Sequence, residues 1–112
     1  MARTITWVKA ALKDFQDFPE AVQDQVMTAL RFAARGEKAD KAKPMTGLGS
    51  GVFEIAIAYR GNAYRAVYAV QIGEDLWVVH AFQKKSKTGM KTPKPAIDLI
   101  RERMTRIKEM LR

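Results

Sequence analysis

One acidic and one basic side chain, Glu54 and Arg65, are the first candidates for chemistry in this sequence. Each lies in a run of β-branched, aromatic and alanine residues, in which successive side chains point to opposite sides of a strand. We expect both to stand on one face of a sheet. An arginine there can bind two oxygens of one phosphate, and a carboxylate can accept a proton. The alternative is a structural ion pair beneath a covering helix.

A basic segment follows the last predicted strand and contains Lys84 and Lys85. No acidic residue occurs between Asp75 and Asp98, so the positive charge of this segment is concentrated. Such a charge attracts the phosphates of a polyanion, whereas the simplest alternative is a solvated lysine-rich loop. The side chains that we expect to bind an RNA backbone here are Gln83, Lys84, Lys87, Lys91 and Thr92.

The residue types that are rare in this chain narrow the chemistry further. Its 112 residues include no cysteine and a single histidine, His80. Thiol catalysis, disulfides and metal centres built from Cys or several His are therefore excluded, and we expect neither a metal nor another cofactor. We expect His80 to be a neutral, hydrogen-bonded core residue, because it lies between large apolar neighbours in a strand.

The net charge of the chain indicates the kind of partner. Twenty Lys and Arg against twelve Asp and Glu give a net charge of +8. This excess on a small protein favours nucleic acid first, then an acidic protein, over an anionic membrane. Because the chain has a globular composition and begins without a long apolar run, we expect one cytoplasmic domain over residues 1–112 and no membrane partner.

Apolar periodicity predicts an α+β fold. It has a short N-terminal strand, a two-helix hairpin, a three-stranded antiparallel meander that completes a small sheet, and a C-terminal helix. In chain order we expect a strand over 4–8, helices over 8–15 and 19–35, a loop over 37–51, strands over 52–59, 63–71 and 76–83, and a helix over 96–111.

The turn between the first two strands of the meander sets the expected register. A two-residue turn at Gly61-Asn62 would pair Ala58 with Arg65 and Glu54 with Ala69. The bulky side of the sheet, which includes His80 and Phe82, should then pack on the first two helices, and the other side should form a shallow polar depression. Its expected floor is Ala56, Ala58, Ala69 and Ala81, with Arg65, Glu54, Gln83 and Lys85 above it.

The segment VVHAFQKKSKTGMKTPK, residues 78–94, resembles the signature of the HigB-like branch of the RelE/ParE-family toxins. Upstream, KPM at 43–45, GVFEI at 51–55 and YRAVY at 64–68 are similar to family segments at similar spacing. The predicted order of elements also matches this family. The resemblance therefore covers nearly the whole chain and implies a RelE-like fold.

The resemblance also implies a function. Toxins of the RelE type in type II toxin–antitoxin systems are ribosome-dependent endoribonucleases that cut mRNA without metal, use the neighbouring ribose 2′-hydroxyl as nucleophile and so inhibit translation. It implies two partners, mRNA on the ribosome and a cognate antitoxin, which we expect to be a small helix-turn-helix protein encoded beside this chain.

Individual residues take roles through the same resemblance. Arg65 is similar to a strand arginine of the family and is expected to bind the scissile phosphate. Lys85 is similar in position to a second family cation, and Lys84 is its nearest substitute. Glu54 and Ala56 stand where some relatives have strand lysines, so Glu54 is either the catalytic base or a structural residue.

Two other functions are compatible with this sequence. A ParE-like gyrase inhibitor would have the same fold and would poison its target by binding a protein, without cutting RNA. A non-catalytic, phage-derived nucleic-acid-binding protein would bind more weakly as salt rises. Fold likeness does not rank these functions, although the lysine block favours RNA.

Overall fold

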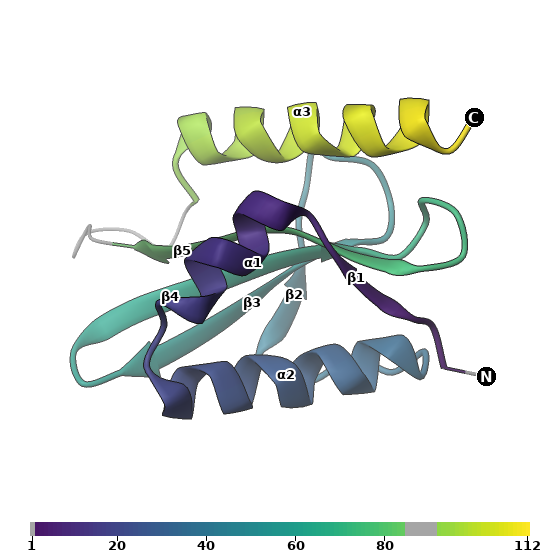
Figure 1. Ribbon diagram of the computed structural model, residues 1–112. Helices are drawn as coiled ribbons and strands as arrows, with labels where there is room; N and C mark the ends of the chain where they lie inside the picture. The colour runs from purple at the N-terminus through teal and green to yellow at the C-terminus, as the bar shows by residue number, and fades with distance from the viewer. Residues whose placement is uncertain (1, 85–91) are drawn as a thin grey trace.

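The computed structural model describes residues 2–84 and 92–112 (Figure 1). In chain order the elements are β1 (Ile5–Trp7), α1 (Lys9–Gln16), α2 (Glu20–Ala34), β2 (Ala42–Pro44), β3 (Val52–Tyr59), β4 (Asn62–Ala69), β5 (Leu76–Lys84) and α3 (Lys94–Met110). They confirm the expected α+β fold. Strand β2 was missed within the predicted 37–51 loop, because three residues ending in proline show no strand alternation.

The strands form one sheet in the order β1-β5-β4-β3-β2. Strand β1 runs parallel to β5, and the other neighbouring pairs are antiparallel. The long meander strands therefore occupy the centre, and the two three-residue strands form the edges. Short edge strands limit unwanted pairing with other chains. No helix in the described ranges has the length and apolarity needed to cross a membrane.

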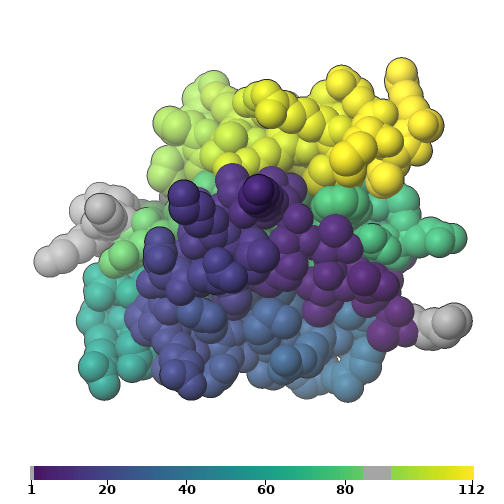
Figure 2. Space-filling model, viewed as in Figure 1, coloured from purple at the N-terminus to yellow at the C-terminus, as the bar shows by residue number. Residues whose placement is uncertain are grey.

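Helices cover both faces of the sheet, with α2 below it and α3 above it in Figure 1. Helices α1 and α2 enclose an aromatic core in which the rings of Phe18 and Tyr64 are 5.0 Å apart. Helix α3 packs on the other face through Ile100, Met104 and Ile107. Figure 2 shows α3 as a ridge along one side of the molecule. Helix α3 therefore covers part of the shallow polar depression that was expected on this face.

The turn between β3 and β4 begins one residue earlier than expected, which shifts the pairing of the two strands by two residues. Tyr59 pairs with Asn62, so the central turn residues are Arg60 and Gly61, with φ of 49° and 78°. Positive φ at both central positions is the requirement of a type I′ turn, whose twist matches the strands. The predicted pairing is thus wrong, but a shift of two residues leaves every side chain on its expected face.

A β-bulge in β5 changes the faces of its second half. Val67 pairs with His80 whereas Tyr68 pairs with Val78, so Val79 is the additional residue. The bulge moves every side chain of the following segment to the face opposite the expected one. His80 and Phe82, predicted to face the first two helices, lie on the α3 side instead. Ala81 and Gln83, predicted for the depression, lie on the other side.

Candidate functional site on the α3 side of the sheet

The centre of the site is an ion pair between β3 and β4. The Arg65 Nη1 atom lies 2.7 Å from Glu54 Oε1, and the side chains are 11% and 13% exposed. Arg65 is directly opposite Ala56, and Glu54 is opposite Val67, so the pair is diagonal. This depth shields the two charges from water and strengthens their attraction. The geometry therefore includes the structural ion pair that was the alternative interpretation.

Thr92, in the chain segment that precedes α3, contacts the ion pair through Glu54. Its hydroxyl donates a hydrogen bond to Glu54 Oε2, so both carboxylate oxygens accept a hydrogen bond. The threonine was predicted to bind an RNA backbone. In this structure it instead holds the carboxylate that is the candidate base.

Arg65 keeps hydrogen-bonding capacity that Glu54 does not use. Its Nε atom is buried and has no hydrogen-bond partner among the described residues. The neighbouring strand positions, Ala56 and Phe82, have no polar side-chain atom to accept from it. A buried donor without a partner costs about 1–3 kcal/mol. An anionic ligand that reaches this guanidinium would remove that cost.

Cations occur on both sides of the pair. Lys43 of β2 is exposed and directly opposite Glu54. Lys84 of β5 is buried and opposite Ala63, on the same face as Arg65. These lysines give the face a positive potential suited to phosphate. Lys85, Lys87 and Lys91, which were also predicted for the site, lie outside the described residues.

His80 lies in the same transverse row as Glu54, with Val67 between them. Its ring stacks on Phe82 at 4.7 Å, and its Nδ1 is 3.3 Å from Arg103 Nη1. Burial, assisted by the Arg103 charge and partly opposed by Asp14, lowers the pKa of His80 to about 4. The imidazole is therefore neutral near pH 7, as expected. Since the arginine can only donate, Nδ1 accepts and the proton is on Nε2.

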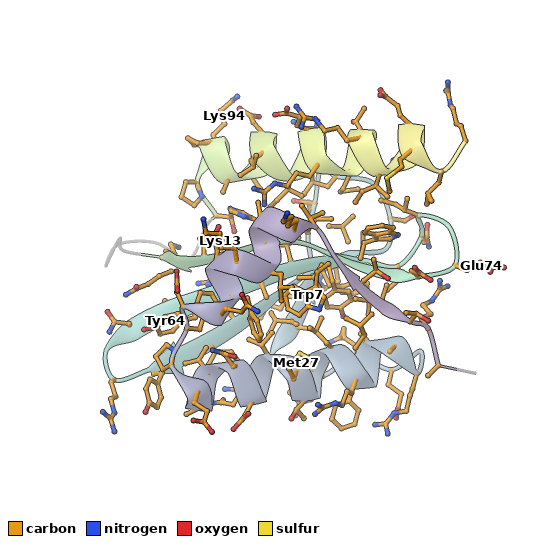
Figure 3. The ribbon with its side chains drawn as sticks, viewed as in Figure 1. Trp7, Lys13, Met27, Tyr64, Glu74 and Lys94 are labelled. Carbon is orange, nitrogen blue, oxygen red and sulfur yellow. The ribbon has the colours of Figure 1, made fainter. Side chains whose placement is uncertain are left out.

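Gln83 is the described site candidate that the structure separates from the others. It pairs with Tyr64, whose side chain lies on the α2 side of the sheet (Figure 3). The bulge in β5 is the cause of this change. The structure thus brings Glu54, Arg65 and Thr92 into contact and places Lys84 on the same face.

Sequence reasoning missed two residues of this face, Lys43 and Arg103. Lys43 was assigned to a loop, and its place beside Glu54 depends on the unexpected strand β2. Arg103 comes from α3, and its Nη1 also donates to the Val79 carbonyl at 2.9 Å. Helix α3 contains several basic residues, and nothing in the sequence around Arg103 shows that its side chain is the one that turns inward.

The described residues include no cluster of three or more His, Cys, Asp or Glu that could hold a metal ion.

Comparisons with known proteins agree on the fold. A family model described as Phage derived protein Gp49-like (DUF891) matches residues 13–105. The structure of the E. coli toxin RelE, a mutant in the free state, is similar with a TM-score of 0.63 and 19% identity, over 96% of this chain and 99% of that chain. A chain of the toxin–antitoxin complex RelBE2 from Mycobacterium tuberculosis is also similar, with a TM-score of 0.52 and 17% identity, over 77% of this chain and 95% of that chain. No curated protein matches the sequence.

Proposed function

We propose that this chain, which belongs to the Gp49-like family of phage-derived proteins, is the toxin of a type II toxin–antitoxin pair. Its RelE-like fold supports the proposal, as does the likeness to a chain solved within a toxin–antitoxin complex. A net charge of +8 suits a protein that acts on RNA and is neutralised by an acidic partner. The HigB-like branch, a cytoplasmic location and a helix-turn-helix antitoxin belong to the same proposal.

The activity that we propose is metal-independent cleavage of mRNA on the ribosome, which inhibits translation. The observation that carries it is the buried Arg65, which has an unused Nε donor and lies beside a carboxylate on a basic face. A phosphate that enters this site would bind the guanidinium in two places. As negative charge develops on the phosphate oxygens, the same contacts would stabilise the transition state.

Glu54 is the proposed general base for the 2′-hydroxyl of the ribose. Thr92 already donates a hydroxyl hydrogen to Glu54 Oε2, and the ribose hydroxyl would take the place of that donor. Glu54 would accept the proton while the 2′-oxygen bonds to phosphorus and the bond from phosphorus to the 5′-oxygen breaks. The products are a 2′,3′-cyclic phosphate and a 5′-hydroxyl. Lys85, or Lys84 in its place, would donate the proton to the leaving oxygen.

Further contacts to the RNA backbone are proposed for the residues near the site. Lys84 shares the face of Arg65, and Lys87, Lys91 and Thr92 follow it in the chain. The positive charges of the lysines would bind phosphates without reading bases, and the Thr92 hydroxyl could do the same once the ribose hydroxyl has replaced it at Glu54. Gln83 is left out because it lies on the opposite face.

Induction of the chain in growing cells tests this function. We expect growth arrest and new mRNA 5′ ends in primer extension within minutes of induction. Arg65→Ala should abolish both, because loss of a transition-state contact costs about 10²-fold or more in rate. Arg60→Ala is the matched control, since Arg60 is an exposed arginine in the turn and should leave both effects intact. Toxicity that survives Arg65→Ala, with the variant shown to be folded, would count against the site.

A further inference from the structure

A groove of about 460 Å³ lies between the N-terminus of α1 and the C-terminal half of α3. Its lining includes neither Glu54 nor Arg65, so it is distinct from the proposed site. Val8, Trp77, Ile107 and Met110 give it apolar walls. This volume is in the range of sites that accept small ligands or the side chains of a bound segment.

The N-terminus of α1 at the groove has no capping side chain. The N-cap residue is Val8, which has no side-chain oxygen, and the first turn of the helix contains no acidic residue. Val8, Lys9 and Ala10 all line the groove. The first N–H groups of a helix carry partial positive charge and bind carboxylates or phosphates. An acidic group is therefore the chemistry that this end of the groove favours.

Trp77 gives an independent indication of a ligand. It lines the groove, is 8% exposed, and its indole Nε1 is buried without a hydrogen-bond partner among the described residues. Buried tryptophan N–H groups usually have an acceptor. A polar atom of a bound segment would supply the missing one.

The charges of the groove favour an acidic occupant. Lys9, Arg103 and Arg106 line it, and the acidic lining residue, Glu102, is paired with Arg106 at 2.7 Å. Met110, which is 64% exposed, places an apolar side chain at the same groove. The occupant should thus be both apolar and acidic. A second copy of this chain would add another net charge of +8 and be repelled.

We propose that the groove docks an acidic, amphipathic segment of a partner protein, with a carboxylate at the N-terminus of α1 and apolar side chains against Trp77 and Met110. The proposed function, on which this inference rests for the partner's identity, makes that partner the antitoxin. Binding between α1 and α3 leaves the Glu54 and Arg65 pair outside the contact. The groove would therefore hold the partner, while other parts of the partner cover the site.

The probe is the purified protein encoded by the reading frame next to the gene of this chain. It is titrated into the Trp7→Phe variant, in which Trp77 is the remaining tryptophan of this chain. Binding in the groove should change Trp77 emission, measured as the difference from the same titration of Trp7→Phe/Trp77→Phe. Met110→Glu and Arg106→Glu should each raise Kd about tenfold or more in calorimetry. Arg31→Glu, an exposed change on α2, should alter Kd less than about threefold.

Three results would overturn the groove inference. They are unchanged affinity in both groove variants, a dimer of this chain that Met110→Glu dissociates, and no binding by the neighbouring protein. Growth arrest by the chain alone tests the proposed function separately. If the chain arrests growth and the groove variants bind the neighbouring protein with unchanged affinity, the toxin proposal still holds. Groove binding without arrest or mRNA cleavage removes the toxin proposal and leaves the docking site.

Discussion

Arg65 and Glu54 are joined by a 2.7 Å hydrogen bond although they lie diagonally on neighbouring strands. The residue directly opposite Arg65 is Ala56, whose small side chain leaves space for the guanidinium to cross toward Glu54. A phosphate would therefore have to share Arg65 with Glu54. The same pair contributes to the fold and to the proposed chemistry.

The first prediction concerns the stability that this pair contributes. Glu54→Leu should lower the free energy of unfolding by about 3 kcal/mol, because it leaves a buried positive charge without its partner. Arg65→Met should have a similar effect. The double variant should lose clearly less than the sum of the two, by about 1–3 kcal/mol, in urea unfolding. Strict additivity would show that the two side chains are not coupled in solution.

The second prediction concerns His80 and acid. Its pKa is about 4 in the folded protein and near 6.5 when unfolded, so above pH 6.5 both states are neutral and its contribution to stability is complete. As the pH falls from 6.5 to 4, the unfolded chain binds a proton that the folded chain does not. Stability should then fall by up to about 1.4 kcal/mol per pH unit, or about 3 kcal/mol in all.

His80→Gln provides the control for that pH dependence. The variant keeps the carboxylates that titrate in the same range but lacks the imidazole. Its free energy of unfolding should therefore fall less steeply than that of the wild type between pH 6.5 and 4.5. Parallel curves for the two proteins would contradict a buried neutral histidine beside Arg103.

The third prediction compares two glycines with positive φ that flank β3. A Cβ at Gly61 would contact nothing within 4 Å, so Gly61→Ala should cost only the backbone strain, about 1 kcal/mol. At Gly51 the added atom would lie 2.6 Å from Gln71 Cγ, and Gly51→Ala should cost about 2 kcal/mol. Thermal unfolding of both variants measures the order, and the reverse order would contradict these turn geometries.

Side-chain alternation was sufficient to find the meander and to place Glu54 and Arg65 on one face. Register was not predictable in the same way, because Arg60 adopts a positive φ that non-glycine residues rarely take. The sequence therefore favoured Gly61-Asn62 as the turn. A two-residue error preserves the face but changes the neighbours, which is why the ion pair between Glu54 and Arg65 was only the alternative interpretation.

The β5 bulge could not be predicted from the local sequence pattern either, for a different reason. Val78 and Val79 are both apolar and both buried, so either can face either core. Packing against α1, α2 and α3 decides which residue is additional, and that decision moves His80 to the α3 side. Arg103 joins His80 from 23 positions along the chain, a contact that depends on how α3 lies on the sheet.

The last prediction separates RNA cleavage from inhibition of gyrase. A gyrase poison would break DNA and induce the DNA damage response, whereas an RNA-cleaving toxin should leave a damage-response reporter silent while mRNA is cut. Because the proposed base takes a proton from the 2′-hydroxyl, the downstream fragments should carry 5′-hydroxyl ends. Polynucleotide kinase should then label them without prior phosphatase treatment. Fragments with 5′-phosphate ends would exclude attack by the 2′-oxygen. Induction of the damage-response reporter without mRNA fragments would favour the gyrase alternative over a role for Glu54 and Arg65 in RNA cleavage.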